Sequence, residues 1–334
     1  MSAPDLSKFL KPNPQGVREL EFRALGTECH IKIRLKSERD ALQFAANTLE
    51  WIKNFEEKYS RYLDTSLISK INAAAGQSWI ETDEDAERLL NVAEEVFRKS
   101  EGILDATMLP LARVWDWKKI HQELPNKDDV QAALRLTGWD KVERREGAIF
   151  LPEKGMGLDF GGFGKELAVD ALIEISRRHN IKDVLIDLGK DVFASGGNGK
   201  HEFWHIGIED GKNPESCLAS LAISDRAVSS SGSYARHFIH ENKRYGHIID
   251  PRSGWPTSNG VNSVTVIAKS CLEAGIHSTV CYILGVDKGL SFTSNFPEID
   301  VCIQSDQGTE GNPQFERWLV KEDNDKDSSS LPKF

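Results

Sequence analysis

A glycine-rich segment that ends in a lysine is the first stretch of this sequence whose residues could do chemistry. Asp159–Lys165, with the sequence DFGGFGK, leads directly into an apolar pattern typical of a helix. Three glycines let the backbone approach a ligand closely, and a helix N-terminus favours phosphate. Because the helix dipole disfavours a cation in the first turn, Lys165 is a candidate contact for a phosphate or carboxylate. The spacing is neither that of a P-loop nor that of a dinucleotide fingerprint, and a purely structural turn explains it equally well.

A hydroxyl-rich stretch followed by a histidine is the second candidate. We predict a turn at Ser229–Tyr234 and an Asp-Pro-x-x-Gly turn at 250–254, with His247 between them. Such a group could form the rim of an active site, since histidine exchanges protons near neutral pH. The alternative is a capped hairpin with His247 hydrogen-bonded inside it. A Ser/His/Asp hydrolase has little support, because the chain has no G-x-S-x-G elbow.

Two further segments have weaker signals. Tyr62 precedes a short helix that the pattern Ser66-x-x-Ser69 and Asn72 predicts. Its ring could stack on a planar ligand, or it could be an ordinary tyrosine at the edge of the core. The segment Gly102–Thr107 is an apolar turn that carries an aspartate and a threonine. It either contributes to a site or fixes the preceding helix.

The elements around these segments mix helices and strands without regular alternation, which favours an α+β fold with antiparallel strands and helices grouped beside them. Ser37 is the predicted N-cap of a helix whose apolar stripe ends near Phe55. Further helices are predicted at 82–102, 128–136, 165–175 and about 270–284, and strands at 29–35, 184–186, 203–208, 218–223, 236–240 and 261–268.

The whole chain has the composition of a globular protein of 334 residues with a net charge of −10. This charge disfavours nucleic acid as a partner. Five cysteines without paired spacing indicate buried thiols in a reducing compartment. Because the chain has no signal-like N-terminus and no apolar run long enough to span a membrane, we expect a cytoplasmic protein. We predict an N-terminal tail at 1–17, one domain at 18–320 and a disordered tail at 321–334.

The order of several motifs along the chain, and the residues within them, closely resemble those of the ApbE family of FAD:protein FMN transferases. The resemblance covers about residues 20–285. It rests on Gly26-Thr27, Ser60-x-Tyr62 with Ser66-x-x-Ser69-x-x-Asn72, Gly102-x-x-Asp105-x-Thr107 with Pro110-Leu111 and Trp117, Asp159–Lys165 with Asp170, Ser231-Gly232-x-Tyr234, His247-x-x-Asp250-Pro251-x-x-Gly254, and Ser263–Ala268.

The resemblance implies a T-fold-like domain that binds FAD and a divalent cation, usually Mg²⁺. It implies transfer of FMN from FAD to a threonine of an acceptor protein, with release of AMP. The residues that it implies for FAD are Leu25, Tyr62, Ile103, Leu104, Asp105, Asp159, Lys165 and Ile249. For the metal it implies the main-chain carbonyl of Gly162 and the hydroxyl of Thr279, and His247 is the candidate for proton transfer.

One departure from the family pattern affects the metal. Gly275 occupies the place of a metal-binding aspartate, and Glu166 follows Lys165 where the family favours glycine. Glu273 and His277 would lie on a different face of a helix from Gly275. Two functions therefore stay open: an active transferase whose Mg²⁺ binding is weakened, rearranged or absent, and a flavin-binding carrier, sensor or scaffold without transfer activity.

Overall fold

The computed structural model describes residues 4, 6–116, 123–213, 216–233, 237–241 and 243–320 of the chain. The chain forms two compact units: unit 1 contains Met1–Asn54, Phe163–Tyr234 and Gly260–Phe334, and unit 2 contains Phe55–Gly162 and Ala235–Asn259. Trp117, Tyr234, Arg236 and the predicted tail at 321–334 lie outside the described residues.

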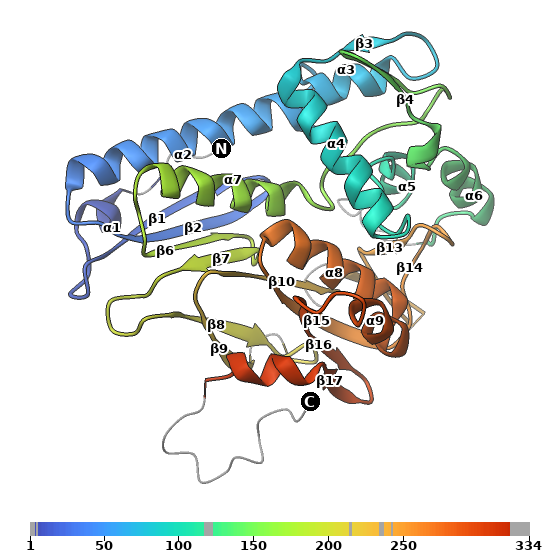
Figure 1. Ribbon diagram of the computed structural model, residues 1–334. Coiled ribbons are helices and arrows are strands. Elements are labelled where there is room, and N and C mark those ends of the chain that lie inside the picture. Colours follow the sequence, from blue (N-terminus) through green and yellow to red (C-terminus); the bar gives the residue numbers. More distant parts are fainter. Residues whose placement is uncertain are drawn as a thin grey trace. The chain divides into compact units, whose positions relative to one another are not determined.

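Unit 1 is built on an eight-stranded sheet with the order β1-β2-β6-β7-β10-β15-β16-β17 (Figure 1). Every neighbouring pair in this sheet is antiparallel. The strands are β1 (Val17–Ala24), β2 (Thr27–Arg34), β6 (Val184–Leu188), β7 (Val192–Ser195), β10 (Arg226–Gly232), β15 (Val261–Ala268), β16 (Asp300–Ser305) and β17 (Gly308–Gly311). The central strands are apolar along most of their length because both faces of the sheet are covered.

Helices cover one face of this sheet, with α7 packed on β6 and β7 and α8 packed on β10 and β15 (Figure 1). The helices of unit 1 are α1 (Ser7–Leu10), α7 (Gly164–Arg178), α8 (Cys271–Leu284), α9 (Val286–Thr293) and the 3₁₀ helix η2 (Pro313–Trp318). The helix α2 (Glu38–Tyr59) begins in unit 1 and ends in unit 2. The hairpin of β8 (Trp204–Glu209) and β9 (Cys217–Ile223) packs against the other face through an apolar cluster that includes Leu185, Val192, Ile267, Trp204 and Leu221.

The register between α7 and α8 is fixed by one carboxylate. Asp170 of α7 accepts hydrogen bonds from the backbone amides of Cys271 at 2.7 Å and Leu272 at 3.0 Å. These amides belong to the first turn of α8, where no carbonyl of the helix can accept from them. Ser270 caps the same turn by accepting from the amide of Glu273. The start of α8 is therefore held against α7.

Unit 2 consists of short helices and small sheets. Its elements are α3 (Leu67–Ala73), β3 (Ile80–Glu81), α4 (Glu84–Lys99), α5 (Leu109–Val114), α6 (Lys127–Arg135), η1 (Trp139–Lys141), β4 (Glu143–Arg145), β5 (Ala148–Phe150), β11 (His237–His240), β12 (Lys243–Gly246), β13 (Ile249–Asp250) and β14 (Trp255–Pro256). The sheets are β3-β5-β4, β11-β12 and β13-β14, and all of their pairs are antiparallel.

An aromatic cluster around Trp115 forms the core against which β11–β14 pack. Trp115 is fully buried and stacks near Tyr245 and Phe238, while Trp255 meets it edge-on at 5.2 Å between ring centroids. The indole Nε1 donates to the carbonyl of Gly254 at 2.8 Å. This bond satisfies the buried indole and fixes the turn after β13.

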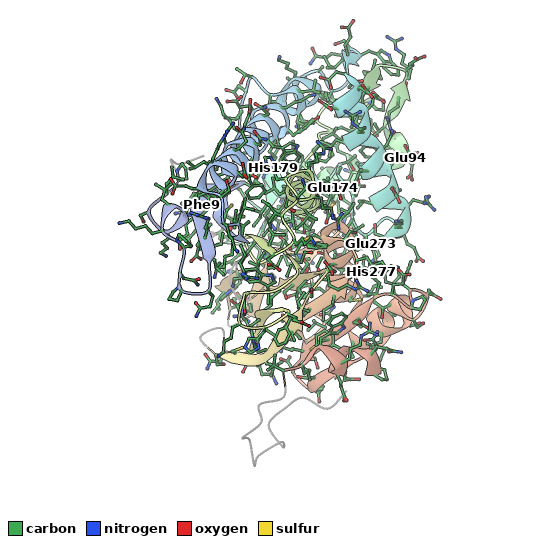
Figure 2. The ribbon with its side chains drawn as sticks, turned by 60° about the vertical axis from the view of Figure 1, so that its left-hand side comes forward. Phe9, Glu94, Glu174, His179, Glu273 and His277 are labelled. Carbon is green, nitrogen blue, oxygen red and sulfur yellow. The ribbon has the colours of Figure 1, made fainter. Side chains whose placement is uncertain are left out.

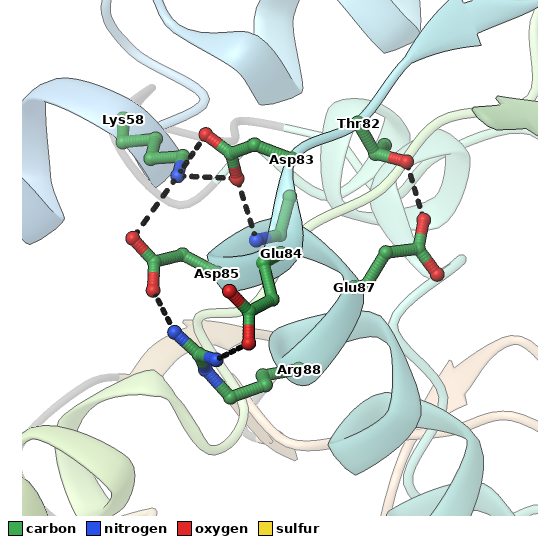
Figure 3. A network of polar contacts seen from close by, with 8 residues as sticks. Lys58, Thr82, Asp83, Glu84, Asp85, Glu87 and Arg88 are labelled. Atoms are coloured by element: carbon green, nitrogen blue, oxygen red, sulfur yellow. Dashed lines mark hydrogen bonds and ion pairs between the residues drawn. The ribbon is translucent and has the colours of Figure 1, made fainter. Parts of the chain in front are cut away.

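The N-terminus of α4 is held by charged side chains (Figure 3). Asp83 is its N-cap and accepts from the amide of Ala86. Lys58 donates to both oxygens of Asp83 at 2.6 Å and lies 3.7 Å from Asp85. Thr82, which the sequence pattern places at the start of this helix, instead donates to Glu87.

The structure corrects two expectations from the sequence. The turn predicted at Ser229–Tyr234 is wrong, because residues up to Gly232 form β10 inside the large sheet. The segment predicted as an N-terminal tail contains α1, and Phe9 is only 1% exposed. The guanidinium of Arg18 donates to the Phe9 carbonyl at 2.8 Å, which ties α1 to β1.

The predicted caps Ser37 and Ser66 are confirmed, since each accepts from an amide in the first turn of its helix. None of the helices built from described residues has both the length and the apolar composition that a membrane crossing requires.

Candidate active site

Lys165 lies in the first turn of α7 and is held by an ion pair. Its Nζ contacts Asp191 Oδ2, and the other oxygen of Asp191 accepts from the hydroxyl of Ser229 at 2.6 Å. Burial lowers the pKa of Lys165, but the negative charges of Glu166 and Asp191 outweigh it and hold the pKa above its usual value. The ammonium is therefore a fixed positive charge at the end of the glycine-rich segment.

Glu166, the next residue, is a buried carboxylate at 6% exposure. Burial, reinforced by the negative charge of Asp191, raises the pKa of the Glu166 carboxyl to about 8, and the attraction of Lys165 opposes this rise. Its Oε2 is buried and receives no hydrogen bond from the residues that the structure describes. An uncompensated buried carboxylate is costly, so this group calls for a proton or a cation.

Thr279 belongs to a group of hydroxyls between α8 and β10. Ser231 Oγ lies 2.9 Å from Thr279 Oγ1 and 2.9 Å from Ser278 Oγ. Ser231 points to α8 because it alternates along β10 with Ser230, which instead pairs with Thr265. The hydroxyl predicted to bind a metal thus lies in an oxygen-rich group.

Leu25 lies at the tip of the hairpin formed by β1 and β2. Ala24 pairs with Thr27, so Leu25 and Gly26 form a two-residue turn, and both have positive φ, at 53° and 72°. A leucine in this conformation is strained, and such strain is found where a site constrains the chain. Two strands, β6 and β7, separate β2 from β10, so Leu25 is apart from the hydroxyl group of Thr279.

In unit 2, a chain of contacts joins Asp159 to Tyr62. Arg61 Nε lies 2.7 Å from Asp159 Oδ2, and its guanidinium lies over the Tyr62 ring at 4.3 Å from the centroid. Asp159 also accepts from the amide of Gly161 at 2.9 Å. Tyr62 is 61% exposed, so one aromatic ring faces solvent beside a fixed charge pair. The core-edge alternative for Tyr62 therefore does not apply.

The turn Ile103–Asp105 packs beside the end of the glycine-rich segment. Ile103 and Leu104 are each 7% exposed, and a Cβ on Gly162 would lie 3.8 Å from Leu104. Asp105 accepts from the amide and the hydroxyl of Thr107, both at 2.7 Å. Burial raises the pKa of Asp105, against the effect of these bonds. The role predicted for the Gly162 carbonyl stays a prediction.

His247 directly follows β12, and Ile249 begins β13. Ile249 packs against the Trp115 cluster. Asp250 accepts from the backbone and guanidinium of Arg252, at 2.9, 2.8 and 2.7 Å, which closes the turn predicted at 250–254. The half-buried His247 is thus carried on a turn anchored by the aromatic cluster.

Sequence reasoning missed two residues of these groups. Arg61 joins Asp159 to Tyr62, and its signal was a cation directly before an exposed aromatic residue. Asp191 holds Lys165, and its signal was a carboxylate after the Gly189-Lys190 turn, where both residues have φ of 77°.

Comparisons with known proteins agree with the motifs. The ApbE family model matches residues 25–303. A Klebsiella pneumoniae (strain 342) protein named FAD:protein FMN transferase is 30% identical over 273 residues, 81% of this chain and 84% of that protein. A Treponema pallidum protein of the same name is 28% identical over 83% of this chain and 81% of its own.

Solved structures show the same fold. The crystal structure of an ApbE protein from Thermotoga maritima matches with a TM-score of 0.81 at 26% identity, over 91% of this chain and 100% of that chain. The flavin transferase ApbE from Vibrio cholerae matches with a TM-score of 0.80 at 22% identity, over 91% of this chain and 99% of that chain. The predicted α+β class with antiparallel strands is confirmed.

Proposed function

The chain belongs to the ApbE family, and from that membership we infer that it is an FAD:protein FMN transferase. The observation that carries this conclusion is the family match over residues 25–303, together with relatives of that name that align over most of their length. This family match favours a transferase over a flavin-binding protein without transfer activity.

The reaction breaks one bond of the FAD pyrophosphate and forms one to the acceptor. The hydroxyl oxygen of an acceptor threonine attacks the phosphorus of the FMN half, and the bridging P–O bond breaks with its electron pair leaving on AMP. The threonine proton must pass to a base. Negative charge grows on the phosphate oxygens during such a transfer, so fixed cations stabilise the transition state. Lys165 fits this role because Asp191 holds its ammonium in place.

The residues of unit 1 fit a divalent cation of the Mg²⁺ type. Such cations prefer hard oxygen ligands, and Thr279 lies among serine hydroxyls. The buried Oε2 of Glu166 is a further oxygen that receives no hydrogen bond from described residues. When bound, Mg²⁺ would neutralise phosphate charge. We propose Thr279 as one ligand through its hydroxyl.

In unit 2, the exposed ring of Tyr62 is proposed to stack on the flavin, because a planar ligand can bury its apolar face there. Asp159, fixed by Arg61, and Asp105 offer acceptors for polar groups of FAD. Ile103, Leu104 and Ile249 offer apolar contacts. His247 is proposed to take the proton of the threonine. In unit 1, the strained turn at Leu25 is proposed to contact the flavin.

We propose that the acceptor is a protein and that the enzyme works in the cytoplasm. The five cysteines, which all lie among the described residues, are thiols and not disulfides, and four of them are buried, which is typical of proteins from a reducing compartment. The net charge of −10 argues against nucleic acid as a partner.

The test incubates the purified chain with FAD, Mg²⁺ and a threonine-bearing acceptor protein. We expect covalent flavin fluorescence on the denatured acceptor and release of AMP in equal amount. Thr279→Val should reduce transfer at least about tenfold, by analogy with the loss of groups that support a metal site. Thr309→Val, the same change on β17, should leave it unchanged. Flavin that binds tightly without AMP release under all conditions would refute transferase activity.

The role of His247 has its own control. His247→Gln should slow transfer and leave FAD affinity unchanged, because the proton acceptor is needed only for the chemical step. Full transfer rate in this variant would exclude His247 as the base.

A further inference from the structure

Glu166 and Gly275 face each other across the contact between α7 and α8. A Cβ placed on Gly275 would lie 2.6 Å from Glu166 Cγ, 2.8 Å from Oε1 and 3.0 Å from Cδ. Real Cβ atoms do not approach other heavy atoms so closely. The carboxylate of Glu166 therefore occupies the space into which any side chain at position 275 would project.

This juxtaposition follows from the way in which the two helices are joined. Glu166 and Asp170 are four residues apart and lie on one face of α7. Asp170 holds the first turn of α8 through the amides of Cys271 and Leu272. Glu166 lies one turn before Asp170 in α7, and Gly275 lies one turn after Cys271 in α8. The same interface therefore places Glu166 against Gly275.

The charges around Glu166 compensate this carboxylate only in part, because Glu166 shares the ammonium of Lys165 with Asp191. Asp191 is matched by Lys165 and by the hydroxyl of Ser229. Glu166 Oε2 is buried and receives no hydrogen bond from the described part of the chain. One ammonium thus stands beside two buried carboxylates, Glu166 and Asp191. A bound cation would compensate the second negative charge.

The same face of α8 carries the hydroxyl of Thr279. Gly275 and Thr279 are four residues apart, which places their Cβ positions about 5–6 Å from each other on a helix. The Glu166 carboxylate occupies the space into which a side chain of residue 275 would project. It is therefore near the hydroxyl of Thr279. Carboxylate and hydroxyl oxygens are the ligands that a hard divalent cation prefers.

Two other residues of α8, Glu273 and His277, could have supplied the missing ligand, but neither lies on the face of α8 that carries Gly275 (Figure 2). His277 packs against Phe292 and Phe296, at 5.5 and 4.6 Å between ring centroids, and its Nδ1 lies 2.8 Å from the Glu273 carbonyl. Glu273 lies in the first turn of α8, two residues from Gly275 and on another face.

We propose that Glu166 supplies, from α7, the carboxylate ligand of the divalent cation that the family resemblance assigns to the position of Gly275. The inference rests on the proposed function only for the identity of the site. The carboxylate thus comes from α7 instead of α8, and the glycine at 275 makes the room that Glu166 needs.

The test measures metal binding directly. Mn²⁺ is titrated into the full-length protein saturated with FAD, and free Mn²⁺ is read from its electron paramagnetic resonance signal. FAD binding is measured separately in EDTA by quenching of flavin fluorescence. Glu166→Gln keeps the shape of the side chain and removes its charge, and Glu273→Gln is the matched control on α8.

We expect E166Q to raise the dissociation constant for Mn²⁺ at least about tenfold, as losses at metal sites do. FAD affinity in EDTA and the E273Q variant should be unchanged. The exchange variant E166G/G275D, which returns the carboxylate to α8, should recover Mn²⁺ binding. G275D alone should not improve it, because the two side chains compete for one space.

Wild-type Mn²⁺ affinity in E166Q, or a wild-type chain that binds FAD but no Mn²⁺, would overturn the proposal. An exchange variant that folds and binds no better than E166Q would do the same. These outcomes are independent of acceptor chemistry: a chain whose Mn²⁺ binding depends on Glu166 but which transfers no FMN would refute the proposed function and leave this inference standing.

Discussion

Replacing Gly275 by alanine is predicted to destabilise the protein, although alanine favours helices more than glycine does. In a helix interior this change normally stabilises by about 1 kcal/mol. At Gly275 the new methyl group would lie 2.6 Å from Glu166 Cγ. Forcing such a group into a filled core costs typically about 1–3 kcal/mol. The free energy of unfolding should therefore fall by up to about 2 kcal/mol.

The same change is predicted to stabilise once Glu166 is alanine. Glu166→Ala removes Cγ, Cδ and Oε1, the three atoms nearest to a Cβ at position 275. The methyl group then fills space, and the helix preference of alanine should raise the free energy of unfolding by about 1 kcal/mol. The sign of the effect thus depends on a residue of the neighbouring helix, which is the signature of direct contact.

The assay is urea-induced unfolding of the wild type, both single variants and the double variant, followed by circular dichroism in EDTA. EDTA removes any contribution from bound metal. Gly289→Ala in α9 is the matched control, because its Cβ would meet Cys281 at 3.1 Å and not Glu166. Its effect should be equal in both backgrounds. If Gly275→Ala has the same sign and size with and without Glu166, the steric reasoning is refuted.

Three further predictions concern other parts of the chain. Burial raises the pKa of Glu87, but the hydrogen bond from Thr82 and the charge of Arg144 outweigh burial and hold this pKa below its usual value. The ionised Glu87 carboxylate therefore stabilises the fold above about pH 4.5, and this stabilisation is lost as the pH falls. Glu87→Gln should therefore lower the free energy of unfolding by about 1 kcal/mol at pH 7, and this difference should shrink as the pH falls below about 4.5; urea titrations that give a constant difference would contradict this. Trp115→Phe removes the donor to the buried Gly254 carbonyl and should cost about 1–3 kcal/mol in the same measurement, whereas a cost near zero would mean that this bond does not hold the turn. Only Cys217 of the five thiols is exposed, and burial raises the pKa of Cys281 and Cys302 to about 12, so one thiol should react with Ellman's reagent before unfolding and five after it; more than one in the native state would contradict the described burial.

Local signals in the sequence predicted those elements whose cause is local. Ser37 and Ser66 are followed by apolar stripes at helical spacing, and both cap helices. The strand β10 could not be predicted in this way, since a run of serines is typical of a turn. Its hydroxyls are accommodated because Asp191, Thr265 and Ser278 supply partners from distant parts of the chain.

The sequence motifs indicated candidate site residues but not how those residues are arranged. The motifs indicated Lys165, Thr279 and Asp159, whereas their partners Asp191, Ser231 and Arg61 depend on strand order and on packing. The sequence also showed Glu166 and Gly275 as two separate departures from a family pattern. That they compensate for each other in space requires the register between α7 and α8.

The strand order of unit 1 also determines when this protein can fold during its synthesis. The hairpin β1–β2 leaves the ribosome early, but β2 pairs with β6. Cys29 of β2 can therefore pair with Leu188 only after β6 has been synthesised. At ribosomal rates of about 5–20 residues per second, the apolar edge of β2 stays open for on the order of 10 s. The edge strand β17 arrives last. A nascent chain of this kind exposes a strand edge that is open to wrong pairing until the second half of the sheet has been made.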